Sequence, residues 1–238
     1  MWFTVRTFLT VCLLVSMISA IGRADQQPPR RTITVTGTGE VSAAPDLALV
    51  SFAVETQAKT AAEAATANAA KTDKVVNAIK GQLKGDDKIM TSGYSLEPQY
   101  QTQERGSLSP PPIVGYVARN EVRVEINRIE AVGRLIDTAI AAGANRISNL
   151  QFTLKDRNPQ LRAALAKAGA EARAQAESVA TALGVQIKQV VAATTSSGPI
   201  VLPRYREGFA AAAASAATPL EPGEVKVSAS LEVSYEIE

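Results

Sequence analysis

The 238-residue chain has no histidine and only one cysteine, Cys12. Without histidine it cannot form the serine or cysteine hydrolase sites that use a histidine base, and zinc sites built from His and Cys are excluded as well. A single cysteine cannot form a disulfide within the chain. Carboxylates, lysines and tyrosines are the side chains left for catalysis.

The N-terminus has the three parts of a secretory signal peptide: the basic Arg6, the apolar run from Phe8 to Ile18, and the small residues Gly22 and Ala24. We therefore predict a signal peptide over residues 1–24 that is cleaved after Ala24. Export of this kind predicts a periplasmic protein, and an association with the outer membrane is left open.

Three alternatives to cleavage after Ala24 are less favoured. Ala20 offers an earlier cut. An uncleaved anchor helix is less favoured because the apolar run is short of the ~20 residues that span a bilayer. A lipoprotein anchored at Cys12 is disfavoured because the bulky Val11 precedes this cysteine, which also lies inside the apolar run. We expect no integral membrane segment in the mature chain.

Cleavage leaves a chain with little net charge. Removal of Arg6 and Arg23 lowers the 25 basic residues to 23, which equals the 23 acidic residues of the whole chain. Nucleic-acid-binding proteins carry a basic footprint, so this balance excludes them as a class.

The pattern of apolar residues predicts an α+β fold with the order β-β-α-β-β-α-β-α-β-β after a flexible leader over residues 25–31. Because strands outnumber helices and do not simply alternate with them, we expect largely antiparallel sheets with helices packed on one face. One domain over residues 32–238 accommodates all of these elements. The predicted strands are 32–41, 47–58, 89–100, 114–126, 147–154, 185–195 and 225–237, and the predicted helices are 60–83, 127–143 and 158–183.

Local signals refine the three helices. Thr60 and Glu63 form a capping box, and Asn127 is the expected cap of the second helix. This second helix is predicted to bury Ile129, Val132, Ile136 and Ile140. The third helix is predicted to have a thin inner stripe of small and apolar residues: Leu161, Leu165, Ala168, Ala172, Ala176, Val179 and Leu183. This stripe either packs in the core, which we favour, or forms a seam between subunits.

The sequence Gly37-Thr38-Gly39 interrupts the first predicted strand, where we expect a bulge or turn. A phosphate-binding loop is excluded there because a second strand follows instead of a helix.

No residue is assigned to catalysis, to a cofactor or to a metal. Asp86 and Asp87 beside Gly85 could hold a cation, but a turn after a helix explains them better. Three further groups of residues have structural explanations that we prefer. The charges Arg119, Glu121, Arg123 and Glu125 alternate as on a solvated sheet face; Tyr94, Tyr100 and Tyr116 are expected to be partly buried; and Lys71, Lys74, Lys80, Lys84 and Lys88 form a solvated face.

Five segments in this order resemble the SIMPL-domain family, in the bacterial exported branch that includes periplasmic immunogenic and oxidative-stress defence proteins. They are VTGTGEVSAAPDLALVSFAVET, TSGYSLEPQY, GYVARNEVRVEI, LIDTAIAAGANRISNLQFTL and ARAQAESVATALGV. The resemblance implies an envelope location, an α+β fold and a ring-like homo-oligomer. It brings no catalytic motif and no cofactor.

Two functions remain from the sequence. The first is a non-enzymatic envelope protein that self-assembles or binds partners and protects against oxidative stress. The second is a carboxylate-based hydrolase acting on an envelope or sugar substrate, which needs two acids facing each other across a cleft. The loops 101–112 and 196–223 lie outside the resemblance, and the apolar residues of the second loop make it a candidate contact between subunits.

Overall fold

The computed structural model describes residues 30–102, 110–196 and 218–238. The predicted signal peptide, most of the leader and most of the loops 101–112 and 196–223 therefore lie outside the described residues.

The order of the elements is the predicted one, and the fold class is α+β. All strand pairs are antiparallel and form two sheets, with strand orders β1-β7-β6 and β3-β4-β2-β5. The strands are β1 (Thr32–Ala43), β2 (Leu47–Ala58), β3 (Lys88–Tyr100), β4 (Ile113–Ile126), β5 (Arg146–Thr153), β6 (Ile187–Ser196) and β7 (Val225–Ile237). The helices are α2 (Ala61–Lys80), the 3₁₀ turn η2 (Ile129–Ala131), α3 (Val132–Ala142) and α4 (Asn158–Leu183).

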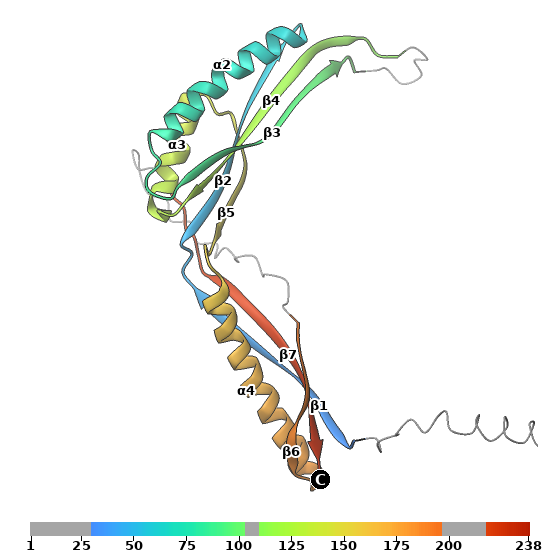
Figure 1. Ribbon diagram of the computed structural model, residues 1–238. Coiled ribbons are helices and arrows are strands. Elements are labelled where there is room, and N and C mark those ends of the chain that lie inside the picture. Colours follow the sequence, from blue (N-terminus) through green and yellow to red (C-terminus); the bar gives the residue numbers. More distant parts are fainter. Residues whose placement is uncertain (1–29, 103–109, 197–217) are drawn as a thin grey trace, which may run out of the picture.

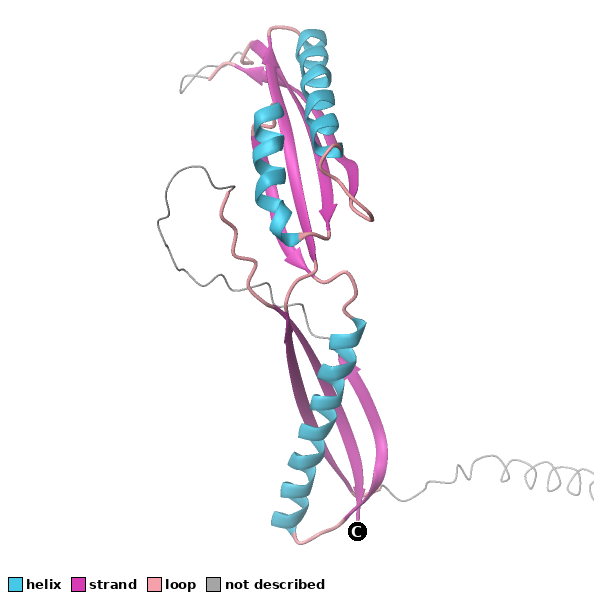
Figure 2. Cartoon of the chain, turned by 90° about the vertical axis from the view of Figure 1, so that its left-hand side faces the viewer, coloured by secondary structure: helices cyan, strands magenta, loops and turns pink. Residues whose placement is uncertain are grey.

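The two sheets lie end to end in an elongated molecule (Figure 1). Helices α2 and α3 cover the four-stranded sheet, and α4 runs along the three-stranded sheet. All three helices lie in front of the strands when the molecule is turned by 90° (Figure 2), so the predicted packing on one face is confirmed.

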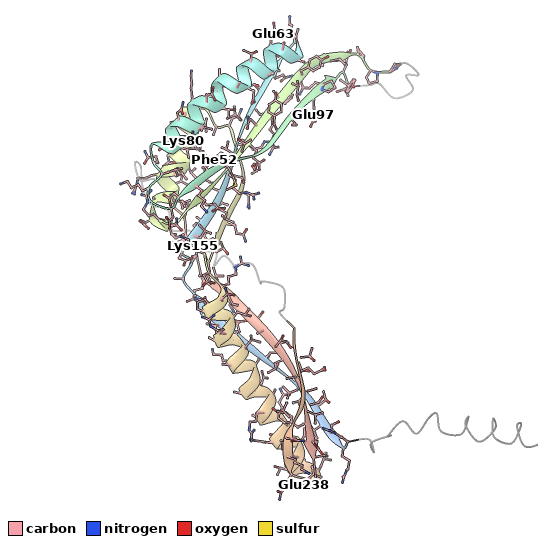
Figure 3. The ribbon with its side chains drawn as sticks, viewed as in Figure 1. Phe52, Glu63, Lys80, Glu97, Lys155 and Glu238 are labelled. Atoms are coloured by element: carbon pink, nitrogen blue, oxygen red, sulfur yellow. The ribbon has the colours of Figure 1, made fainter. Side chains whose placement is uncertain are left out.

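Alternation along β2 builds the core of the four-stranded sheet. Ala48, Val50, Phe52 and Val54 point to the helices and are almost fully buried, as predicted. Phe52 lies near the middle of the four-stranded sheet (Figure 3) and belongs to the apolar cluster between this sheet and its helices. The predicted capping box of α2 is present, because the Thr60 hydroxyl accepts a hydrogen bond from the Glu63 amide and the Glu63 carboxylate accepts one from the Thr60 amide.

The buried face of α2 is more polar than the sequence indicated. Asn68 is fully buried and donates hydrogen bonds to the carbonyl oxygens of Val54 and Ala118, on two neighbouring strands. Thr72 donates to the side-chain oxygen of Asn68. These bonds fix the position of the helix over the sheet. The periodicity of apolar residues does not predict them, because Asn68 and Thr72 are polar.

Two expectations for the second helix are wrong. Asn127 does not cap it, since its backbone and side-chain N–H groups both donate to Asp87, and Arg128 occupies the cap position of η2 without a side-chain bond. Ile140 is 51% exposed, because the buried stripe of α3 runs through Leu135, Ile136 and Ala139.

β7 is the central strand of the three-stranded sheet, as its long alternation predicted, and α4 packs over β1 and β7. The inner stripe of α4 differs from the prediction, because Val179 and Leu183 are exposed. The buried residues of α4 recur at every fourth position and are all alanine: Ala164, Ala168, Ala172, Ala176 and Ala180. This stripe packs within the chain, which favours the core interpretation over a seam between subunits.

Gly37 and Gly39 do not interrupt β1, so the expected bulge or turn is wrong. The pairing of β1 with β7 is continuous through both glycines. Both face α4, and a methyl group at Gly37 would lie 2.5 Å from the amide nitrogen of Ala172 and closer still to the carbonyl oxygen of Ala168. The two glycines therefore let the backbone of α4 approach β1, opposite the alanine stripe.

Candidate functional site

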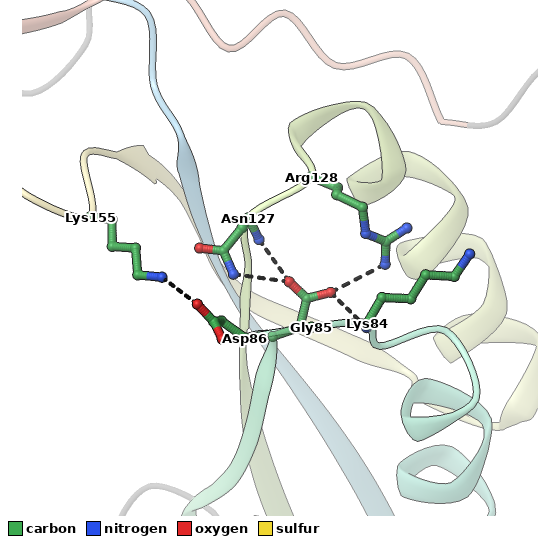
Figure 4. Close-up of a pocket in the computed structure, with 7 residues that line it drawn as sticks. Lys84, Gly85, Asp86, Asn127, Arg128 and Lys155 are labelled. Atoms are coloured by element: carbon green, nitrogen blue, oxygen red, sulfur yellow. Dashed lines mark hydrogen bonds and ion pairs between the residues drawn. The ribbon is translucent and has the colours of Figure 1, made fainter.

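A pocket of ≈350 Å³ lies near the junction of the two sheets, where Figure 3 labels Lys155 of its lining. Three connections contribute its lining: the turn from α2 to β3, the link from β4 to η2, and the link from β5 to α4 (Figure 4). The lining residues are Lys84, Gly85, Asp86, Asp87, Asn127, Arg128 and Lys155.

Asp87 is the centre of this site. Its carboxylate accepts hydrogen bonds from the amides of Asn127 and Lys84, from the Asn127 side chain and from Arg128, at 2.9–3.1 Å. Burial by itself raises the pKa of Asp87, but these donors outweigh it, and the pKa lies below its ordinary value. The carboxylate is therefore ionised and fully engaged, and it ties the α2–β3 turn to the start of η2.

Asp86 has a different environment. Its side chain is 78% exposed and pairs with the Lys155 ammonium at 2.9 Å. The hydrogen bond and the charge of Lys155 lower the pKa of Asp86. The amide of Lys155 donates to Asp46, in the link between β1 and β2. An exposed ion pair of this kind contributes little to stability, because water screens it.

The arrangement favours a structural role over acid–base or metal chemistry. A general acid or base needs a pKa near the working pH, and the pKa values of both aspartates are shifted the other way. Within residues 30–102, 110–196 and 218–238, no three His, Cys, Asp or Glu side chains are grouped so that they could hold a metal ion. The turn interpretation of Gly85-Asp86-Asp87 is thus preferred to the cation site.

The sequence indicated the aspartates of this site but not their partners. Asn127 is 40 residues from Asp87, and Lys155 is 69 residues from Asp86. No spacing rule joins residues this far apart, because only the packing of three separate connections brings them together.

We expect Asp87→Asn to lower the free energy of unfolding by about 2 kcal/mol at pH 7, since it weakens a buried set of charge-assisted hydrogen bonds. The pKa of Asp87 is depressed in the folded state, so its contribution is complete above the unfolded pKa of about 3.9 and is lost as pH falls through the folded pKa. Denaturant unfolding of both proteins from pH 7 to pH 2 should show the difference closing below about pH 4.

The neighbouring substitution Asp86→Asn is the matched control for this experiment. Because Asp86 is exposed, we expect a much smaller change in the free energy of unfolding than for Asp87→Asn at pH 7. Equal losses in the two variants would contradict the structural role given to Asp87.

The alternating charges of β4 lie on the sheet face away from the helices, as predicted. Arg119 pairs with Glu121 at 2.8 Å, and Ser148 on β5 donates to the same carboxylate. Burial raises the pKa of Glu121, but the bonds from Arg119 and Ser148 outweigh it and the pKa is lowered.

The burial predicted for the three tyrosines is found only in part, whereas the exposure predicted for the five lysines is found in full. Tyr116 is half-buried, but Tyr94 and Tyr100 are each 56% exposed and are less buried than predicted. The five lysines around the end of α2 are exposed, as on a solvated face.

Within the described part of the chain, no helix combines the length and the hydropathy needed to cross a membrane.

Comparison with known proteins gives a family but no activity. A family model, SIMPL, described as a protein of unknown function (DUF541), matches residues 33–235. The chain is 32% identical to the 26 kDa periplasmic immunogenic protein of Brucella melitensis biotype 1, across 99% of this chain and 97% of that protein. It is 27% identical to the uncharacterized protein YggE of Edwardsiella ictaluri, across 83% of this chain and 79% of that protein. With the family model covering nearly all of the two sheets and a full-length relative at this identity, the chain belongs to the SIMPL family.

Proposed function

We propose that this protein is a non-enzymatic component of the cell envelope, which is exported by the signal peptide of residues 1–24 and acts through self-association and protein partners. The names of the Brucella relatives support the periplasmic location. A ring-like homo-oligomer and an association with the outer membrane are parts of the same proposal.

One observation carries this proposal. Six large apolar side chains of the β3–β4 hairpin are each at least 38% exposed: Met90, Tyr94, Leu96, Tyr100, Ile113 and Val114. Exposed apolar side chains in such number favour contact with another surface. The hairpin extends to the end of the molecule that lies farthest from the C-terminus (Figure 1), where a partner can reach it.

A carboxylate-based hydrolase is the competing proposal. It requires two acids that face each other across a cleft with room for the substrate bond. The carboxylates of the junction pocket are sequence neighbours bound to protein donors, which favours the non-enzymatic proposal. Turnover of an envelope or sugar substrate that a single Asp or Glu substitution abolishes would reverse this preference.

Protection against oxidative stress belongs to the proposal through the family resemblance. Cys12 falls in the predicted signal peptide, so the mature chain has no thiol to oxidise. Protection would therefore depend on the binding of other proteins. Peroxide sensitivity of a deletion strain, restored by the wild-type gene, tests this part directly.

Export and assembly are tested together on protein from the periplasmic fraction. We expect N-terminal sequencing to begin near Asp25, and native mass spectrometry to give a multiple of the mass of the mature chain. Intact Met1 on membrane-bound material would contradict cleavage, and a monomer at micromolar concentration would contradict self-association.

A further inference from the structure

β6 is an edge strand with one free side, and its outer half is exposed. Within the described residues it pairs with β7 alone, and α4 packs over β1 and β7 while barely touching β6. Residues 190–195 are exposed throughout, with Val190 at 56% and Val191 at 39%. The unpaired backbone groups of such a strand are a template for a further strand.

The other edge of the same sheet is protected by side chains of α4. The Thr38 amide on β1 donates to the Glu171 carboxylate at 2.6 Å, and the Lys167 ammonium donates to the Glu40 carbonyl oxygen at 2.9 Å. These bonds occupy backbone groups that an added strand would need. β1 is therefore closed to pairing at its centre.

The edges of the four-stranded sheet are protected in other ways. β3 contains Pro98, which cannot donate a backbone hydrogen bond, and the charged Lys88 and Glu97, and its register shifts twice. β5 has only eight residues, includes a register shift and carries the Arg146–Glu55 ion pair.

From Ala192 to Thr195, β6 has none of these protections. The sequence Val190-Val-Ala-Ala-Thr-Thr195 has no charge and no proline, and it is rich in β-branched residues. Its two register shifts against β7 lie between Ile187 and Ala192, and pairing is regular from Ala192 to Ser196. Among the four edges in the described residues, this one alone is open to pairing.

We propose that the outer edge of β6, at residues 190–195, pairs antiparallel with β6 of a second copy of this chain. The inference rests on the proposed self-association and adds a second contact surface to the exposed side chains of the β3–β4 hairpin. A two-fold axis normal to the sheet would join two three-stranded sheets into one of six strands. Because the segment is uncharged, no like charges face each other across the axis, so the edge is compatible with its own copy.

This symmetry makes a geometric prediction. In antiparallel pairing about such an axis, one residue of β6 faces its own copy directly. The mature chain has no cysteine, so a single introduced cysteine can form a disulfide only between copies. We expect one of Ala192→Cys, Ala193→Cys and Thr194→Cys to give a covalent dimer on mild oxidation of the purified mature protein.

Thr36→Cys is the matched control for this experiment. Thr36 on β1 and Thr194 on β6 are both exposed and both pair with Glu232 of β7, from opposite sides. The two residues therefore differ mainly in the edge on which they lie. We expect no covalent dimer from Thr36→Cys, because α4 side chains occupy the β1 edge.

A second variant measures the association itself. Val190→Lys places a charge from each copy at the contact, and we expect the dissociation constant to rise at least about tenfold. The control Ile140→Lys changes a side chain of similar exposure, 51%, on α3 of the other sheet, and should leave association unchanged. Circular dichroism checks that both variants fold.

The outcomes separate this inference from the proposed function. If the wild-type protein associates, but none of the three cysteines forms a dimer and Val190→Lys associates normally, the β6 contact is wrong while self-association stands. If the wild-type protein is a monomer under all conditions, both proposals fail. Cross-linking on β6 together with the loss of association in Val190→Lys would establish the contact.

Discussion

Gly37→Ala is expected to lower the free energy of unfolding by about 3 kcal/mol, because it disturbs the packing of α4 on the three-stranded sheet. The added methyl group would lie 2.5 Å from the Ala172 amide nitrogen and closer still to the Ala168 carbonyl oxygen, both of which are helix backbone atoms. A side chain could rotate away from the methyl group, but backbone cannot, so α4 has to move off β1. Denaturant unfolding followed by circular dichroism measures the loss.

Gly93→Ala is the control for this prediction. Gly93 also lies in a strand, but its added methyl group would meet nothing nearer than the Glu121 Cβ at 3.9 Å, which is an ordinary contact. We expect a change within about 0.5 kcal/mol. A stable Gly37→Ala protein would mean that the close approach of α4 to β1 is not essential to the fold.

Phe52→Ala is expected to lower the free energy of unfolding by about 3–5 kcal/mol. Phe52 is fully buried in the core that joins β2 and β4 to α2 and α3, and its removal leaves a cavity that the helices and strands around it cannot fill. Urea unfolding at pH 7 provides the measurement.

Tyr94→Ala removes an aromatic side chain from the same sheet, at a position that is 56% exposed. Its effect should stay below about 1 kcal/mol. Similar losses in the Phe52 and Tyr94 variants would contradict the burial of Phe52.

The Gly37 and Phe52 variants together also test whether residues 32–238 form one domain. Each substitution lies in a separate apolar cluster, one in each sheet. If the chain unfolds as one unit, each variant shifts a single transition. If the sheets unfold independently, each variant shifts only its own transition, and the prediction of a single domain is wrong.

Strands could be predicted well because alternation is a local signal. β2 and β7 have the predicted bounds, since each alternates over a dozen residues and one full face of each is buried. The capping box of α2 was also found, because Thr60 and Glu63 are three residues apart. Signals of this kind depend on neighbours in sequence, not on how the chain packs.

Helix faces were predicted less well because a stripe can be read in more than one way. In α4, the predicted stripe contains Ala168, Ala172 and Ala176, which are buried, but the leucines and Val179 assigned to the same stripe are not, and Ala164 and Ala180 are buried in their place. The choice depends on Gly37 and Gly39, which lie on another element more than 120 residues away and leave room only for small side chains. In α3, Ile140 was placed in the core on the same kind of periodicity and is exposed.

The sequence by itself determined the compartment expected for this protein, the order of its elements and the chemistry that it lacks, because these depend on composition and local pattern. Tertiary structure alone decided which strands became edges, that Asp87 holds the α2–β3 turn to Asn127 and Arg128, and that Lys167 and Glu171 protect β1. The physical reason is that a hydrogen bond between distant residues needs both partners within about 3 Å. That proximity is set by the packing of whole helices and sheets, which no local pattern in the sequence records.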